Sequence, residues 1–324
     1  MRIKFSITLY YALLFLVALF FMHPTSDSDA VIKLLILFTL YFITSNRVIT
    51  NVLTIFCDKA IYFYSVLLVT YFIFLAVWYS FSYVFFDHVE PNIAIVSYIF
   101  QKGSLVYHNI NAPELYSLQY GPMLYIINGF FINLFGPSIF SSKVSGVTAA
   151  VLGLLFLFLL LRNNLGNKFS LKYMGYIILC YLIFGNYTFW NRPDSYILFL
   201  VSLGLFSVVN GNRLIATIVC GLALGIIVGL KIFAPLYLMP IFSLLYLRFG
   251  IRWLATSLLI AIPIAFSPFI IYKNISFQNY IFNLSIAVKH GIKNAACFKS
   301  IKFAFFYILV PNIIWLSFFH MKLR

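Results

Sequence analysis

The sequence predicts an all-α fold, a polytopic transmembrane bundle of about ten helices with a large external first loop that carries interfacial helices. Three observations support this. Of the 324 residues, 63% are hydrophobic, only 9% are charged, and the mean hydropathy is +1.01. A soluble domain is about 45–50% apolar and about 25% charged, so the composition excludes an ordinary soluble enzyme. It also excludes a disordered chain, which needs low hydrophobicity and high charge.

The charge balance supports the same fold class. The chain has 22 basic and 7 acidic residues and a net charge of +15. Its basic residues stand singly between long apolar runs, a pattern typical of a membrane protein with positive cytoplasmic loops rather than of a nucleic-acid binder. The 4 cysteines form no CxxC pair and no zinc-spaced cluster with histidine, which argues against a structural zinc site or a redox motif.

Apolar runs mark the individual helices, because about 20 apolar residues are needed to cross a bilayer. In chain order they are Phe5–Met22, Val31–Thr44, Ile61–Phe86, Val144–Leu161, Tyr173–Trp190, Tyr196–Val209, Leu214–Leu230, Phe233–Leu247, Trp253–Tyr272 and Ile301–Phe319. The first follows Arg2 and Lys4 and precedes no small-residue cleavage site, so we interpret it as a retained anchor instead of a signal peptide. All are expected to be helical, since lipid offers no partner to open backbone groups.

With a cytoplasmic N-terminus, more than half of the 22 basic residues fall in short inside segments, as the positive-inside rule requires. These residues are Arg2, Lys4, Arg47, Lys59, Arg162, Lys168, Lys172, Arg213, Arg248, Arg252, Lys322 and Arg324. The apolar segment Met123–Phe135 is too short to span, and a crossing there would move the basic loop 162–172 outside. We therefore expect it to lie in or dip into the outer interface, within an external loop Asp87–Lys143.

The expected organisation has three parts. Residues 1–60 form an N-terminal membrane hairpin, residues 61–272 form a transmembrane core that includes the external loop 87–143, and residues 273–324 form an external loop and the last transmembrane helix. No soluble domain or repeat array is visible between the spans.

The acidic residues on the predicted external side are candidate functional groups. They are Asp87, Glu90, Glu114 and Asp194. Asp87 and Glu90 are three residues apart after a span, which places both on one face if the helix continues. Two carboxylates at a membrane surface can divide the work of general base and of metal or phosphate-site ligand. The alternative is a hydrated helix end.

Two further segments bring cations to the same side. In Asn191–Asp194 the Arg-Pro pair favours a turn, and Asp194 can then N-cap the next helix or polarise its start. Alternatively, Arg192 and Asp194 simply pair at the interface. Lys231 follows glycines at a spacing of four, which favour close helix packing, and the segment lacks the order of a phosphate-binding loop. Lys231 either holds a lipid phosphate or snorkels to the interface.

Several motifs in order carry a resemblance to a known family. They are D-H-V-E-P at Asp87–Pro91, Q-K-G-S-L-V-Y at Gln101–Tyr107, Q-Y-G-P-M-L-Y at Gln119–Tyr125, L-F-G-P-S at Leu134–Ser138, R-P-D at Arg192–Asp194 and the glycine-rich run Gly221–Lys231. Together they resemble GT-C-type polytopic membrane glycosyltransferases of the aminoarabinose-transferase and mannosyltransferase-like superfamily, which use polyprenyl-phosphate-linked sugars. The resemblance covers roughly Ile61–Leu247. The chain departs from it in its short length and in having three predicted spans before the acidic loop, where such enzymes usually have one.

The resemblance implies sugar transfer with inversion at the outer face of a membrane, most simply the bacterial cytoplasmic membrane. Asp87 would act as general base and Glu90 as a second carboxylate or metal ligand. The implied substrate-binding residues are Arg192, Asp194, Lys231, Tyr107, Tyr120 and Glu114. Among these, the two cations would stabilise the leaving lipid phosphate and the two tyrosines would shape the sugar pocket.

The implied partners are a polyprenyl-phosphate sugar donor, a glycan, lipid or protein acceptor, and the lipid bilayer, with no nucleic acid. A divalent metal stays open as a cofactor. Two other classes also stay open. A transporter or lipid flippase would place ionisable groups near the membrane midplane, where only Lys33 falls well inside a proposed span. A non-catalytic assembly subunit would tolerate the loss of Asp87 and Glu90.

Overall fold

The computed structural model describes residues 47–109, 111–113, 120–183 and 189–289, and within them all regular secondary structure is helical. The helices are α3 (Arg47–Phe81), α4 (Val89–Gln101), α5 (Pro122–Phe135), α6 (Ile139–Leu165), α7 (Asn167–Ile183), α8 (Pro193–Asn210), α9 (Arg213–Leu230), the 3-10 helix η1 (Ala234–Leu238), α10 (Met239–Phe249), α11 (Ile251–Ile271) and α12 (Phe277–Lys289). The predicted all-α class is confirmed for this part of the chain.

Five helices are long and apolar enough to cross a membrane: Asp58–Phe81 within α3, and α6, α8, α9 and α11. Two predicted spans correspond to shorter helices. The span Tyr173–Trp190 is represented by the 17 residues of α7, and the span Phe233–Leu247 is divided between η1 and α10. The predicted spans Phe5–Met22, Val31–Thr44 and Ile301–Phe319 lie outside the described residues. An integral membrane protein is therefore indicated, with five of the ten predicted spans matched by helices of sufficient length.

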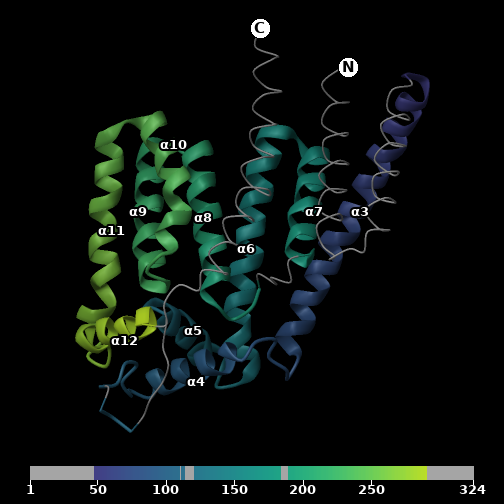
Figure 1. Ribbon diagram of the computed structural model, residues 1–324. Coiled ribbons are helices and arrows are strands. Elements are labelled where there is room, and N and C mark those ends of the chain that lie inside the picture. Colours follow the sequence, from purple (N-terminus) through teal and green to yellow (C-terminus); the bar gives the residue numbers. More distant parts are fainter. Residues whose placement is uncertain (1–46, 110, 114–119, 184–188, 290–324) are drawn as a thin grey trace.

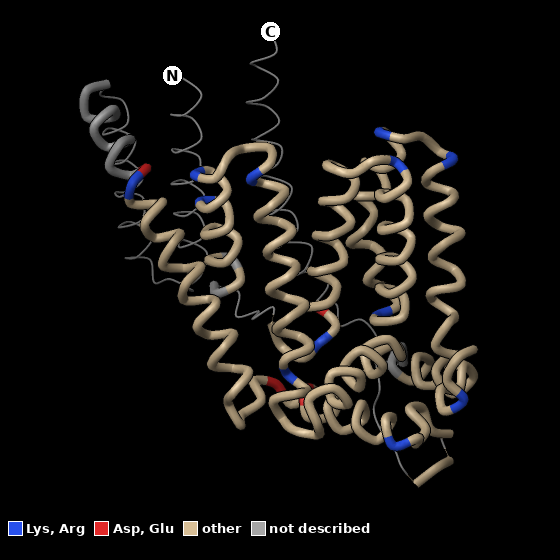
Figure 2. Tube along the Cα trace, turned by 180° about the vertical axis from the view of Figure 1, so that it is seen from behind, with Lys and Arg blue, Asp and Glu red and all other residues tan. Residues whose placement is uncertain are grey.

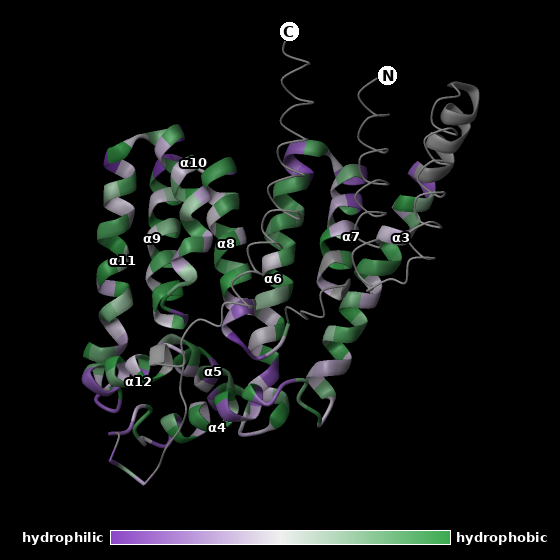
Figure 3. Cartoon of the chain, in the orientation of Figure 1, coloured by the Kyte–Doolittle hydropathy of each residue, from purple (hydrophilic) through white to green (hydrophobic). Residues whose placement is uncertain are grey.

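The long helices stand side by side, whereas α4, α5 and α12 lie across one end of the bundle (Figure 1). We call this end the lower end and the opposite end the upper end, as drawn in Figure 1. The segment Met123–Phe135, predicted to be a helix that does not span, is α5 and lies crosswise at the lower end. Apolar residues cover the upright helices, and hydrophilic residues gather near the two ends (Figure 3).

The apolar interior has two clusters. One joins side chains of α4, α5 and α8 to α10, and the other joins side chains of α3, α6 and α7. Small residues allow the closest approach between helices. A Cβ at Gly221 would lie 2.8 Å from Ile260, and a Cβ at Gly225 would lie 2.6 Å from Ile264, so this face of α9 fits directly against α11. These glycines therefore have a packing role, as their spacing predicts.

Charged residues divide between the two ends (Figure 2). The basic loops between α6 and α7, α8 and α9, and α10 and α11 all lie at the upper end, which agrees with the predicted grouping of inside loops. Among the described acidic residues, Asp58 lies at the upper end, while Asp87, Glu90 and Asp194 lie at the lower end. The bundle is thus electrostatically asymmetric.

The predicted span Ile61–Phe86 is five residues too long, because α3 ends at Phe81. Lys143 explains why. It lies in α6, where its fully buried Nζ donates hydrogen bonds to the backbone oxygens of Tyr79 (3.1 Å), Ser82 (2.8 Å) and Val84 (2.6 Å). A cation at a helix C-terminus satisfies carbonyls that no longer have a helical partner. Lys143, predicted to lie in an external loop, instead lies in α6 and stabilises the end of α3 and the segment after it.

Candidate functional site

Residues from four distant segments meet at the lower end. Arg192 Nη1 lies 2.8 Å from Asp87 Oδ2, and Arg192 Nη2 donates a hydrogen bond of 3.3 Å to the hydroxyl of Tyr120. Lys231 Nζ lies 3.6 Å from Asp194 Oδ1. We call these five residues the carboxylate–cation cluster. Arg192 also interacts electrostatically with Asp194, so the two ion pairs form one group of two negative and two positive side chains.

Both carboxylate oxygens of Asp87 have partners. One faces Arg192, and the other lies 2.8 Å from Nδ1 of His88 and 3.4 Å from the backbone nitrogen of Val89. The Asp87 side chain is only 11% exposed, whereas that of His88 is 92% exposed. Asp87 is thus held in a defined orientation, close to solvent but covered by its partners.

Glu90 occupies a different environment from Asp87. Its side chain is fully buried and accepts four hydrogen bonds. The donors are the Tyr79 hydroxyl, the backbone nitrogens of Phe86 (2.9 Å) and Asp87 (3.0 Å), and the backbone nitrogen of Asn191 (3.3 Å). The prediction that Asp87 and Glu90 share one helical face is therefore wrong. The chain leaves α3 at Phe81, Asp87 precedes α4, and only Glu90 lies in its first turn.

Glu90 fixes the backbone on both sides of the Asp87–Arg192 pair. One carboxylate oxygen holds the peptide nitrogen of Asp87 itself, and the other holds the peptide nitrogen of Asn191, the neighbour of Arg192. Burial raises the pKa of Glu90 above its ordinary value, while the backbone donors and the charge of Lys143 act to lower it. Burial outweighs these opposing effects, so Glu90 holds its proton to a higher pH than a carboxyl group in water.

The start of α8 presents Arg192 and Asp194. Arg192 occupies the N-cap position with an extended backbone, and Pro193 is the first helical residue, where its missing N–H costs nothing. Asp194 lies in the first turn, so of the two alternatives it is the acidic residue beside the positive end of the helix dipole and not the N-cap. Arg192 Nε is buried and has no hydrogen-bond partner among the described residues. The guanidinium group therefore still has donor capacity.

Two buried asparagines, Asn128 and Asn191, hold this turn through hydrogen bonds. Asn191 is fully buried, and its side-chain oxygen accepts a hydrogen bond from the amide of Asn128 in α5. The same amide also donates to the backbone oxygen of Ser142 and to the hydroxyl of Ser145 in α6. The turn before α8 is thus fixed to α5 and α6, and Arg192 projects from a rigid base.

Tyr120 and Tyr107 reach the cluster in different ways. The Tyr120 hydroxyl contacts Arg192 directly, whereas the buried Tyr107 hydroxyl donates a hydrogen bond of 2.7 Å to the backbone oxygen of Tyr120. Desolvation raises the pKa of Tyr107 well above its ordinary value, which keeps this phenol protonated as a donor. Tyr107 therefore positions Tyr120 and does not itself border the charged groups.

Glycines place Tyr120 beside the end of α9. The backbone nitrogen of Gly121 donates a hydrogen bond of 2.9 Å to the oxygen of Leu230, next to Lys231. A Cβ at Gly121 would lie 2.1 Å from the backbone oxygen of Gly229. The two backbones can touch because Gly121 lacks a side chain, whereas a Cβ at Gly229 would lie 2.4 Å from the side chain of Met123. The contact joins the segment of Tyr120 to that of Lys231.

Gly121→Ala is expected to destabilise the protein by about 2 kcal/mol, because the new methyl group meets backbone that cannot move aside. The matched control is Gly204→Ala in α8, where the nearest neighbours of a Cβ lie 3.8 Å away and the substitution favours the helix. Thermal unfolding in detergent measures both variants. An unfolding midpoint for Gly121→Ala at or above that of Gly204→Ala would contradict the close contact between Gly121 and Gly229.

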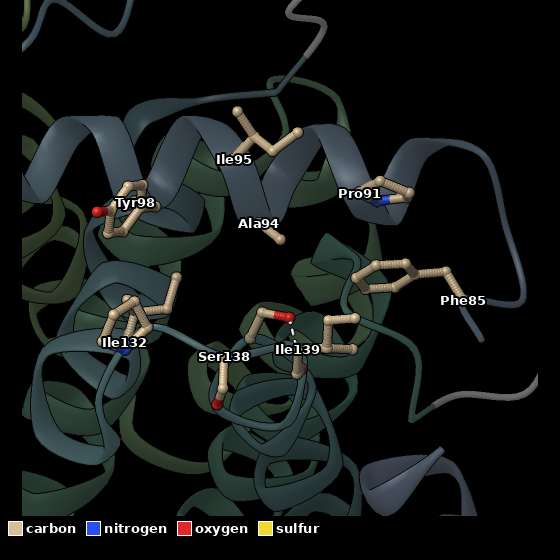
Figure 4. Close-up of a pocket in the computed structure, with 10 residues that line it drawn as sticks. Phe85, Pro91, Ala94, Ile95, Tyr98, Ile132, Ser138 and Ile139 are labelled. Atoms are coloured by element: carbon tan, nitrogen blue, oxygen red, sulfur yellow. Dashed lines mark hydrogen bonds between the residues drawn. The ribbon is translucent and has the colours of Figure 1, made fainter. Parts of the chain in front are cut away.

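A separate apolar groove of about 250 Å³ runs between α4, the end of α5 and the start of α6 (Figure 4). It is lined by Phe85, Pro91, Ala94, Ile95, Tyr98, Ile132, Pro137, Ser138, Ile139 and Ser142. No member of the carboxylate–cation cluster lines it. The groove therefore lies on another face of α4 from the buried Glu90.

The predicted site residues divide into two groups. The carboxylate–cation cluster contains five of them: Asp87, Arg192, Asp194, Lys231 and Tyr120. Glu90 and Tyr107 are buried and bond to the backbone that carries the cluster. Glu114 lies outside the described residues. Within the described ranges, no three side chains of His, Cys, Asp or Glu are grouped as metal ligands.

No known protein family, curated protein or solved structure matches the chain.

Proposed function

We propose that the chain is a GT-C-type membrane glycosyltransferase that moves a sugar from a polyprenyl-phosphate donor to an acceptor at the membrane surface. The observation that carries this proposal is the meeting of Asp87, Arg192, Asp194 and Lys231 at one end of an apolar bundle. Cations at the end of membrane helices suit the phosphate of a lipid-linked donor, and a neighbouring carboxylate suits proton removal.

Each group has a place in the proposed reaction. The acceptor hydroxyl gives its proton to Asp87 while its oxygen forms the new bond to the anomeric carbon of the sugar. The bond between that carbon and the phosphate oxygen breaks, and its electron pair leaves with the lipid phosphate. Arg192 and Lys231 stabilise this developing negative charge, Arg192 through directed N–H donors and Lys231 as a point charge.

The ion pairs of the free protein suggest how donor binding and base activation are linked. Arg192 holds Asp87 at 2.8 Å, so a phosphate that binds to Arg192 competes with this carboxylate. Donor binding would then release Asp87 to accept the proton. Glu90 already accepts four hydrogen bonds within the protein. We therefore assign it the role of a positioning residue, not that of a second carboxylate that contacts the substrate.

The same proposal orients the chain in the membrane. The upper end carries the short basic loops and would face the cytoplasm, so the cluster at the lower end would face outward. A lipid-linked donor fits that side, and the acceptor would be a glycan, lipid or protein reaching the outer surface of a bacterial cytoplasmic membrane.

The test is transfer of labelled sugar in membranes that contain the full chain, with polyprenyl-phosphate sugars and nucleotide sugars supplied separately. We expect transfer from the lipid-linked donors, and Lys231→Gln should reduce it by about tenfold or more. Lys273→Gln, which removes the same charge just beyond α11 at the lower end, is the matched control and should retain activity.

Two outcomes would overturn the proposal. In one, no lipid-linked donor supports transfer. In the other, the labelled lipid crosses the membrane without any transfer, which would identify a flippase. If Lys231→Gln behaves like the Lys273→Gln control, Lys231 has no part in the site.

A further inference from the structure

The upper end of the bundle carries a second charged surface. Arg213 begins α9, Arg248 lies in the last turn of α10 and Arg252 lies in the first turn of α11, and all three are exposed. The connections are very short. Gly250, whose φ of +90° suits glycine, is the one residue between α10 and α11, and residues 211–212 alone separate α8 from α9. Because these connections are short, they restrict the positions of the three arginine backbones.

Contacts bring the two connections together. Arg248 Nη1 donates hydrogen bonds to the backbone oxygens of Val208 and Val209 at the end of α8. The guanidinium carbon of Arg213 lies 5.2 Å from the ring centroid of Trp253, the residue after Arg252. The arginines of the two connections are therefore neighbours, and two of them are already oriented by intramolecular contacts.

This surface is not neutralised by any described acidic residue. On the other side of the upper end, Asp58 pairs with Lys168 at 2.9 Å and also with Lys172. The remaining acidic residues in the described ranges lie at the lower end. The starts of α9 and α11 and the ends of α8 and α10 meet here, so their helix dipoles offset one another and the positive field comes from the arginines. The arginine surface thus has the charge and geometry to bind an anion.

Its surroundings are those of a lipid headgroup. Leu214 is 55% exposed beside Arg213, and Ile251 is 61% exposed beside Arg252. Trp253 has the amphipathic ring typical of the membrane interface. We propose that Arg213, Arg248 and Arg252 bind the phosphate headgroup of an anionic phospholipid, whose acyl chains lie along the apolar faces of α9 and α11. Basic pockets between the cytoplasmic ends of transmembrane helices are suited to such lipids, and this site does not depend on the proposed sugar transfer.

The test is native mass spectrometry of the purified full chain in detergent, titrated with phosphatidylglycerol and, separately, with zwitterionic phosphatidylcholine. We expect the wild type to prefer phosphatidylglycerol. Arg213→Gln and Arg252→Gln should each weaken its binding by roughly fivefold and leave phosphatidylcholine unaffected. Arg248 is left in place because it also holds the end of α8. Arg162→Gln removes one arginine from the last turn of α6 at the same end and should have no effect.

Three results would overturn the inference. These are equal binding of the two lipids by the wild type, an Arg162→Gln effect as large as that of Arg213→Gln, and displacement of phosphatidylglycerol by millimolar inorganic phosphate, which would assign the site to a soluble anion. If Arg213→Gln does not fold, Arg252→Gln alone decides the test.

Discussion

Replacing Asp87 with asparagine is expected to lower the turnover of sugar transfer by a factor of about 10²–10⁴, the range found when a general base is lost. Donor binding should be retained or become tighter. Asparagine has nearly the shape of aspartate but carries no charge, so it no longer pairs with Arg192 as Asp87 does at 2.8 Å. The guanidinium group is then free to bind the lipid phosphate. Steady-state kinetics with a labelled lipid-linked donor would show lower kcat with unchanged or lower KM.

The matched control is Asp58→Asn. Asp58 is the acidic residue described at the upper end, and it pairs with Lys168 and Lys172 just as Asp87 pairs with Arg192. Its loss removes an ion pair of similar kind without touching the cluster, so transfer should continue at the wild-type rate. A rise in KM for Asp87→Asn with kcat unchanged would mean that Asp87 serves donor binding, not proton transfer.

The members of the cluster could be predicted because acidic residues are scarce in this chain. With 7 acidic residues in 324, each carboxylate outside a solvated turn is informative, and Asp87, Arg192, Asp194 and Lys231 all stand at the ends of predicted spans. Alternating helices return their ends to the same side of a membrane. Side chains at corresponding ends therefore approach one another even when they are far apart in the sequence, as Asp87 and Arg192 do.

The different environments of Asp87 and Glu90 could not be predicted from their spacing. A spacing of three suggests a shared helical face, but the path of the chain depends on Lys143, which lies 56 residues after Asp87. By bonding one carbonyl in the last turn of α3 and two in the segment that follows, Lys143 holds the chain in its turn away from the helix before α4. Tertiary contacts of this kind leave no local signal, because a lone lysine near an apolar run looks like an ordinary interfacial charge.

The spacing of the glycines in α9 predicts only part of their structural role. The repeat at Gly221, Gly225 and Gly229 correctly indicated packing between helices, yet the three residues do not meet the same element. Gly221 and Gly225 face α11, whereas Gly229 meets the segment of Gly121 and Met123. The glycine in the Q-Y-G-P motif is therefore explained by the backbone of residue 229, more than 100 residues away, a contact that only the three-dimensional structure reveals.

Replacing Glu90 with glutamine is expected to destabilise the protein by about 3 kcal/mol and to impair transfer, although the two side chains have nearly the same shape. Glu90 meets four donors. Even with its proton in place, the carboxyl group carries a single O–H donor, whereas an amide turns two N–H donors toward these partners and leaves buried donors unpaired, which is costly. Tyr79→Phe is the matched control. It removes one donor and keeps the carboxylate, so its destabilisation should be about 1 kcal/mol.

The pH dependence of this difference tests the environment of Glu90 directly. Because burial raises its pKa above the ordinary 4.5, the folded protein binds this proton more tightly than the unfolded chain does. The resulting stabilisation is complete below pH 4.5 and is lost as the pH rises through the raised value. The gap in thermal stability between wild type and Glu90→Gln should therefore narrow over that range, while Tyr79→Phe keeps the wild-type pH dependence. A gap that widens with rising pH would mean that the donors and Lys143 outweigh burial and hold Glu90 ionised.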